Sequence, residues 1–242
     1  MLLYTDDKNL DDNVLEIAKK LNASLVNKTP SDAYLQYDSD GLSLITDPLN
    51  IKSKIHVDFL KGKVGWRIKR FQHESSLKKA LGRNKEDITI FDATAGFLSD
   101  TMIFLSLGHK VIAVEKNKIV FHLVSDAIRR ASTKLEFINK LDFRCADSFD
   151  LYQSLKHKCD IVYLDPMYPI TKKNQKKSGL IEAIKLLQRK ENLVEDGDDL
   201  IDKFMMDDFK KIIIKRPLKS PKKYSNINYQ VKGSTTRFDI YL

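Results

Sequence analysis

Short apolar runs alternate along most of the chain with segments whose apolar residues follow helical spacing. Runs at residues 88–91, 110–114, 141–145 and 159–164 have the length and β-branched character of buried strands, and each leads into a turn or a helical pattern. Further strands are indicated at residues 211–215 and 237–241. Strands that alternate with helices predict an α/β fold with a largely parallel sheet.

The first 60 residues show a smaller version of this alternation. One helix is indicated near residues 10–21, and two strand-like runs flank a hairpin sequence at residues 38–41. We therefore expect a small N-terminal α/β appendage at residues 1–60 and the main domain at residues 61–242.

Acidic residues follow the successive predicted strands of the main domain. Asp92 opens a turn of small residues that includes Gly96 and enters a helix, and Glu115 ends the second strand about 20 residues later. Asp147 follows the third strand and Asp165 the fourth. Because right-handed crossovers place the carboxyl ends of parallel strands at one edge, these acids are predicted to converge on a ligand site.

The turn after Asp92 indicates which nucleotide-like ligand this edge binds. It lacks the three glycines that seat the pyrophosphate of NAD, whereas S-adenosylmethionine (SAM) has ribose and adenine without a pyrophosphate. Asp92 and Asp100 would face the positive groups of SAM, and Glu115 would accept hydrogen bonds from the ribose. Asp147 could bind the adenine amino group, or Asp147 or Ser148 could cap the following helix.

The most informative stretch is Asp-Pro-Met-Tyr-Pro at residues 165–169, directly after the fourth strand. Pro166 fixes the backbone, so that the Asp165 carboxylate and the Pro166 carbonyl can together accept hydrogen bonds from an NH2 group. Tyr168 offers a flat face on which a nucleobase can stack. The alternative interpretation is an acidic strand end followed by a proline turn.

Composition favours a polyanionic partner. The net charge is +9 and the pI is about 9.3, which points first to nucleic acid and second to an anionic membrane. The two cysteines, both in apolar strand-like segments, suggest neither a disulfide framework nor a zinc site, and no signal peptide or membrane span is indicated. The candidate RNA-binding residues are Arg67, Lys69, Arg70, Lys172, Lys173, Lys176, Lys177, Lys215 and Arg216.

Together, residues 92–96, 162–169, 215–217 and 237–241 resemble the RsmJ family of bacterial 16S ribosomal RNA guanine-N2 methyltransferases. The resemblance implies a Rossmann-like seven-stranded sheet and methyl transfer from SAM to guanine N2. This chain departs from the usual family turn, because residues 96–100 read Gly-Phe-Leu-Ser-Asp and lack the second glycine and the arginine. The residues that the resemblance matches to SAM contacts are Ser99, Asp100, Glu115, Lys116, Asp147, Ser148 and Asp165.

The sequence thus predicts a monomeric, cytoplasmic methyltransferase that acts on 16S ribosomal RNA or the small ribosomal subunit and needs no metal. Asp165, Pro166 and Tyr168 are its predicted catalytic residues. Two alternatives remain open. One is an amino-methyltransferase that acts on adenine in DNA or RNA, and the other is a non-catalytic RNA-binding factor in ribosome assembly.

Overall fold

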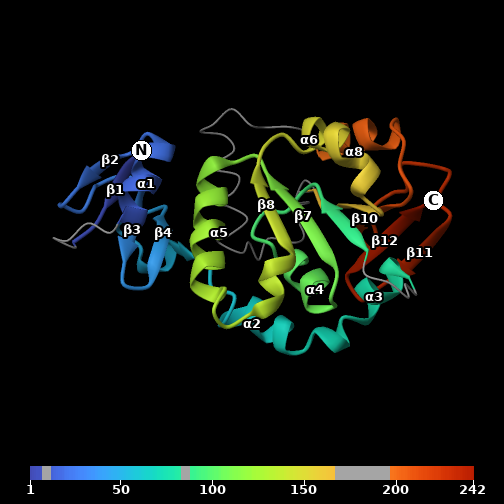
Figure 1. The fold of residues 1–242 in the computed structure, drawn as a ribbon, viewed down its shortest axis with the longest axis horizontal. Coiled ribbons are helices and arrows are strands. Elements are labelled where there is room, and N and C mark those ends of the chain that lie inside the picture. The colour runs from blue at the N-terminus through green and yellow to red at the C-terminus, as the bar shows by residue number, and fades with distance from the viewer. Residues whose placement is uncertain (7–11, 83–87, 167–196) are drawn as a thin grey trace.

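The protein contains two β-sheets that lie on either side of a long helix (Figure 1). The structure is a computed structural model that describes residues 1–6, 12–82, 88–166 and 197–242. Within these residues, no helix is long and apolar enough to cross a membrane. The larger sheet carries the strands that the sequence places before the candidate site residues.

The larger sheet has seven strands in the order β11-β12-β10-β9-β6-β7-β8. The neighbouring strands from β10 to β8 are parallel, and β12 is antiparallel to both β10 and β11. This arrangement confirms the predicted Rossmann-like α/β fold. The bounds are β6 Thr89–Asp92, β7 Lys110–Glu115, β8 Leu141–Cys145, β9 Ile161–Leu164, β10 Ile212–Pro217, β11 Tyr229–Lys232 and β12 Thr236–Tyr241.

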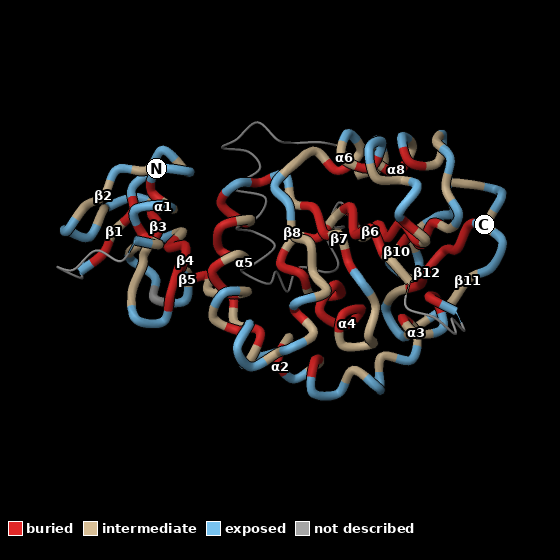
Figure 2. The backbone as a smooth tube through the Cα atoms, in the orientation of Figure 1, coloured by how far each residue is buried: buried red, intermediate tan, exposed pale blue. Residues whose placement is uncertain are grey.

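Apolar side chains from alternate strand positions fill two separate layers, one on each face of this sheet. Among the described residues, Tyr163 of β9 points into a layer packed by four helices, and Val162 points into a layer packed by two. Figure 2 shows the buried strands enclosed by partly exposed helices. The first layer holds α2 Gly62–Lys69, α3 Ser75–Leu81, α4 Thr101–Ser106 and α5 Lys118–Ala131, and the second holds α6 Ser148–Leu155 and α8 Gly197–Met205.

The smaller sheet contains β1 Leu2–Tyr4, β2 Ser24–Val26, β3 Tyr34–Asp38, β4 Gly41–Ile45 and β5 Lys54–His56 in the order β2-β1-β3-β4-β5. Helix α1 (Asp12–Leu21) packs on it, and β4 packs against α5 of the larger unit. One apolar cluster runs from Leu3 in β1 to Ile240 in β12. The division into residues 1–60 and 61–242 stays a prediction, because this cluster is continuous across it.

Three local features add to the sequence expectations. Residues 62–69 form helix α2, which carries exposed basic side chains. The helix after the glycine turn begins at Thr101, because Gly96 and Leu98 both adopt positive φ, +50° and +57°, and delay its start. Cys145 is exposed at the end of β8, whereas Cys159 is buried. The predicted hairpin, with β3 and β4 paired across residues 38–41, is present.

Candidate active site at the carboxyl edge of the sheet

The carboxyl ends of β6, β7, β8 and β9 lie at one edge of the larger sheet, as their parallel pairing requires. Asp92 pairs in register with Tyr163 of β9, and Glu115 pairs with Cys145 of β8. Asp165 follows β9 directly and Asp147 lies two residues beyond β8. The four predicted strand-end acids therefore share this edge.

Asp92 is buried beneath the glycine turn and holds its backbone. Its carboxylate accepts hydrogen bonds from the backbone N–H of Thr94 at 3.2 Å and from the hydroxyl of Thr101. Burial raises the pKa of Asp92 to about 7, although both hydrogen bonds oppose that shift. Asp92 thus links the turn to the first residue of α4.

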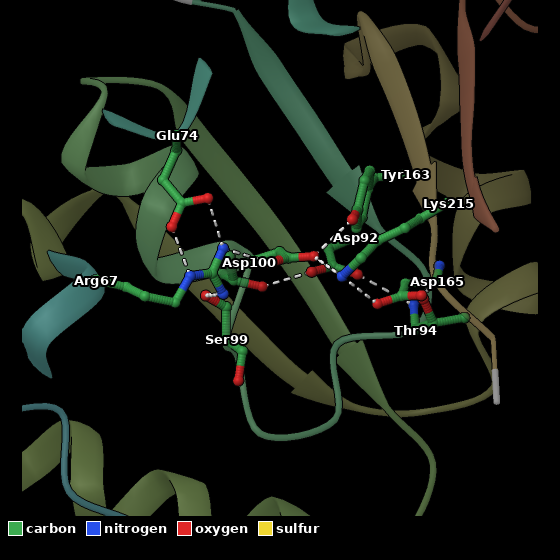
Figure 3. A network of polar contacts seen from close by, with 10 residues as sticks. Arg67, Glu74, Asp92, Thr94, Ser99, Asp100, Tyr163, Asp165 and Lys215 are labelled. Carbon is green, nitrogen blue, oxygen red and sulfur yellow. Dashed lines mark hydrogen bonds and ion pairs between the residues drawn. The ribbon is translucent and has the colours of Figure 1, made fainter. Parts of the chain in front are cut away.

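Asp100 lies at the centre of a polar network that joins three distant parts of the chain (Figure 3). Its carboxylate contacts Lys215 Nζ of β10 at 2.6 Å, Arg67 Nη2 of α2 at 2.9 Å and the Tyr163 hydroxyl at 2.6 Å. Burial disfavours the charge, but the cations of Lys215 and Arg67 outweigh it and lower the pKa of Asp100 to about 2. Asp100 is therefore ionised, and its carboxylate is bound by Lys215, Arg67 and Tyr163.

Arg67 extends this network back to α2 and the segment that follows it. Its guanidinium binds both carboxylate oxygens of Glu74, at 2.6 and 3.1 Å, and donates to the carbonyl oxygen of Ser99 at 3.0 Å. A bidentate Arg–carboxylate pair fixes the orientation of both groups. The network thereby anchors α2 beside the loop that follows Gly96.

Asp165 forms the solvent-facing end of the network. Its backbone N–H donates to Thr94 Oγ1 at 2.7 Å, and its carboxylate lies 2.8 Å from Lys215 Nζ. The side chain remains 36% exposed, unlike that of Asp100 at 9%. Burial raises the pKa of Asp165, and Lys215 opposes this rise. Pro166 is buried, and Tyr168 lies outside the described residues.

Comparison with known proteins identifies the family to which this site belongs. The family model for SAM-dependent methyltransferases (SAM_MT) matches residues 16–242. Ribosomal RNA small subunit methyltransferase J of Francisella tularensis subsp. novicida (strain U112) is 30% identical over 219 residues, which cover 87% of each chain. This chain belongs to the RsmJ family of SAM-dependent methyltransferases.

Further relatives support the assignment over the whole length of the methyltransferase. Ribosomal RNA small subunit methyltransferase J of Thioalkalivibrio sulfidiphilus (strain HL-EbGR7) is 28% identical over 245 residues and covers 97% of this chain and 94% of its own. The crystal structure of the SAM-dependent methyltransferase NGO1261 from Neisseria gonorrhoeae superimposes with a TM-score of 0.74. That protein is 27% identical, with coverage of 100% of this chain and 95% of its own.

The geometry of the methyltransferase edge fits SAM. The turn after β6 is built from small residues, with Ala93 and Ala95 buried, and among the described residues a Cβ at Gly96 would meet only the Thr94 carbonyl oxygen, at 3.9 Å. A ligand therefore has room beside the backbone. Glu115 lies at the end of β7, where its Oε1 accepts from the Asn117 N–H at 2.7 Å and is held in place.

Asp147 and Ser148 follow β8, and the sequence allows them either to contact adenine or to cap the next helix. Asp147 caps α6 by accepting from the backbone N–H groups of Phe149 and Asp150, at 3.0 and 3.2 Å. Its other oxygen lies 3.0 Å from Lys116 Nζ, and Ser148 is buried at the helix start. The predicted cap is confirmed, whereas contact of these residues with adenine stays a prediction.

Three predicted RNA-binding residues have partners within the protein. Arg67 and Lys215 belong to the network of Figure 3. Arg216 is buried, with its guanidinium 3.7 Å from both Asp239 and Asp198. Lys69 and Arg70 are exposed, and Lys172, Lys173, Lys176 and Lys177 lie outside the described residues. The RNA-binding role of these residues stays a prediction.

Sequence reasoning missed the residues that complete the network. Tyr163 lies in an apolar strand pattern that hides its hydroxyl, and Glu74 lies in a charged segment that resembles a solvated helix start. Thr94 is one of several small residues in the turn. Arg67, Asp100 and Lys215 are separated by many residues, so no local spacing indicates that they meet.

A small polar cavity of about 220 Å³ adjoins the network. Arg67, Asp100 and Lys215 form part of its wall, and the turn between β11 and β12 contributes Ser234. Among the described residues, no cluster of His, Cys, Asp and Glu has the arrangement of a metal site.

Proposed function

We propose that this methyltransferase transfers the methyl group of SAM to the exocyclic N2 of a guanine in 16S ribosomal RNA. The observation that carries the proposal is the position of Asp165, which directly follows β9 with its side chain partly exposed and its backbone N–H bonded to Thr94. The RNA substrate follows from the names of the relatives, which are ribosomal RNA small subunit methyltransferases. Guanine N2 is what the resemblance to the RsmJ family implies.

The residues at the end of β9 supply an acceptor for an amine. Thr94 holds the backbone N–H of Asp165, and Lys215 holds one carboxylate oxygen. The Asp165 carboxylate and the Pro166 carbonyl would accept the amine hydrogens, which directs the nitrogen lone pair towards the methyl group. Bound SAM supplies an electrophilic methyl group on a sulfonium.

Proton transfer follows from the same geometry. The amine nitrogen forms the new N–C bond as the C–S bond breaks, and its proton becomes acidic during this step. Asp165 accepts that proton or passes it to water, so a strong base is not needed beforehand. Glu115, Lys116, Asp147 and Ser148 would hold the ribose and adenine of SAM, and Asp92, Gly96, Ser99 and Asp100 would shape the turn beside it.

The substitution Asp165→Ala tests the assignment. We expect the turnover number to fall by about 100-fold or more, because one oriented acceptor is lost. RNA affinity and SAM binding by calorimetry should change little. Asp142→Ala is the matched control, because its ion pair with Arg144 faces solvent. Near-full turnover by Asp165→Ala would show that the catalytic assignment is wrong.

The base is identified by mapping methylated nucleotides in 16S ribosomal RNA from cells with and without the gene, followed by restoration with purified enzyme. We expect one guanine to lose its N2 methyl group. Methyl transfer to adenine but not to guanine would contradict the proposed substrate and would support the alternative of an adenine amino-methyltransferase. We also expect a monomeric, metal-independent enzyme that acts in the cytoplasm, which gel filtration, chelator treatment and cell fractionation would check.

A further inference from the structure

Helix α2 exposes an aromatic side chain that packing does not explain. Trp66 is 58% exposed, and it is the only tryptophan in the chain. The guanidinium of Arg70 lies 4.9 Å from the centre of its ring, and Lys63 and Lys69 are exposed beside it. Because residues 63, 66 and 70 are three and four positions apart, they share one helix face. We call Lys63, Trp66, Lys69 and Arg70 the α2 face.

The contacts that attach α2 to the rest of the protein come from the opposite side of the helix. Gly65 and Ile68 are buried, and Arg67 reaches inward to Asp100, Glu74 and the Ser99 carbonyl. The exposed tryptophan is therefore not required to anchor the helix. Trp66 directly precedes Arg67, and Arg67 belongs to the network that contains Asp165 (Figure 3).

A hollow connects the start of α2 with the glycine turn. Lys61 and Lys63 of this segment and Phe97 and Ser99 of the turn line a cavity of about 420 Å³. Asp40 and Asp58 also contribute to its wall, so the hollow itself is of mixed charge. Lys63 of the α2 face thus lines a hollow that it shares with Ser99 of the glycine turn.

We propose that the α2 face is an RNA-docking surface on which Trp66 stacks against an unpaired base near the methylated nucleotide. Three exposed cations share this face with the ring, and the guanidinium of one of them, Arg70, lies over it, while the nearby Glu74 pairs inward with Arg67. Cations that contact phosphates, beside a ring that stacks on a base, form the usual surface for single-stranded RNA. Arg70 already lies over the Trp66 ring, so the two side chains lose less freedom on binding than they would if they were unpaired.

This inference rests on the proposed function only in taking the RNA substrate as the partner. It adds the stacking role of Trp66 and the orientation of α2 to the RNA contact that the sequence indicates for Arg67, Lys69 and Arg70 in this segment. Arg67 is not part of the α2 face, because its guanidinium is turned inward towards Asp100.

The single tryptophan makes the proposal directly measurable. Full-length enzyme is titrated with protein-free 16S ribosomal RNA and with a 20-nucleotide single-stranded oligoribonucleotide, and tryptophan emission is recorded. We expect saturable quenching of the emission, because a stacked base quenches the indole. Added salt should reverse the quenching, because salt ions weaken the contacts between the RNA phosphates and the basic side chains. RNA binding by filter assay without any change in emission would overturn the proposal.

Two substitutions separate stacking from charge. Trp66→Ala should weaken RNA affinity about 10-fold and raise the KM for RNA more than it lowers kcat, whereas Trp66→Phe should retain most of the affinity. Tyr229→Ala is the control, because Tyr229 is a 39% exposed aromatic residue on edge strand β11. Circular dichroism melting would verify that the variants are folded. Equal affinities for wild type and Trp66→Ala would also overturn the proposal.

The two proposals fail in different ways. Quenching by RNA in an enzyme that transfers no methyl group to ribosomal RNA would contradict the proposed function and support the α2 face. Normal methyl transfer with no quenching, and with an unaffected Trp66→Ala variant, would contradict the α2 face and leave the proposed function standing.

Discussion

Lys215 lies between the carboxylates of Asp100, which precedes α4, and Asp165, which follows β9. Its ammonium is 2.6 Å from Asp100 and 2.8 Å from Asp165, and the two acids raise the pKa of Lys215 despite its burial. Lys215 is one of the candidate RNA-binding residues in the sequence, at the end of a predicted strand. In the structure its charge instead compensates two acids that would otherwise repel each other.

Replacing Lys215 should change the pH dependence of methyl transfer. Asp165 accepts the amine only when it is ionised, so activity is lost as the pH falls through its pKa. Burial and Asp100 raise that pKa and Lys215 lowers it. In Lys215→Met the pKa rises further, and the acid limb of kcat/KM should move to higher pH.

The control for this prediction is Lys215→Arg, which retains the positive charge and should keep the acid limb near that of the wild type. Single-turnover rates measured across the pH range would give both profiles. A Lys215→Met enzyme with an unchanged acid limb and merely a lower rate would contradict the prediction.

At the scale of the elements, α2 depends on a close approach between its own first turns and the chain that enters it. A Cβ at Gly65 would lie 2.6 Å from the backbone carbon of Leu60 and 2.8 Å from its carbonyl oxygen. Real Cβ atoms do not come this close to backbone, so a side chain at position 65 would force the helix outward. The same displacement would move Arg67 away from Asp100.

Gly65→Ala should therefore destabilise the fold by about 1–3 kcal/mol, as overpacking typically does, and should lower kcat by disturbing the network. Thermal unfolding should show a melting temperature lower by several degrees. Lys69→Ala, on the exposed side of the same helix, should change stability by less than about 0.5 kcal/mol. Equal melting temperatures for Gly65→Ala and Lys69→Ala would contradict the argument.

At the scale of the whole molecule, one buried acid joins the two sheets. Asp126 of α5 accepts a hydrogen bond from the backbone N–H of Leu42 in β4 at 2.9 Å, and it pairs with Arg129 and Arg130 at 2.8 Å each. Gly41 allows this approach, since a Cβ there would clash with the Asp126 carboxylate. Arg130 in turn donates to the carbonyl oxygen of Val57.

Asp126→Ala should lower the free energy of unfolding by about 2–4 kcal/mol, because it leaves a buried N–H and a partly buried arginine without their acceptor. Wild-type protein should unfold in one transition, since one apolar cluster spans both sheets. Denaturant unfolding would measure both effects, with Asp142→Ala as the surface control. An unchanged midpoint for Asp126→Ala would show that this contact does not couple the sheets.

The sequence by itself determined the parts of this protein that depend on neighbours along the chain. Strand positions, the acids that end them and the Asn117 cap of α5, which accepts from the Val120 N–H at 2.9 Å, are all local patterns. The parallel topology then follows from general chirality, and it places the acids on one edge. Most of the fold and the location of the site were therefore predictable.

The tertiary structure alone decided what these acids contact. The Arg67–Asp100–Lys215 network and the Leu42–Asp126 bond join residues far apart in sequence, and their energies depend on burial and on charges from other elements. The spacing of residues along the chain does not indicate these long-range contacts, so Arg67 and Lys215 resemble surface cations in the sequence. Folding largely buries both side chains and brings each of them into contact with a carboxylate partner.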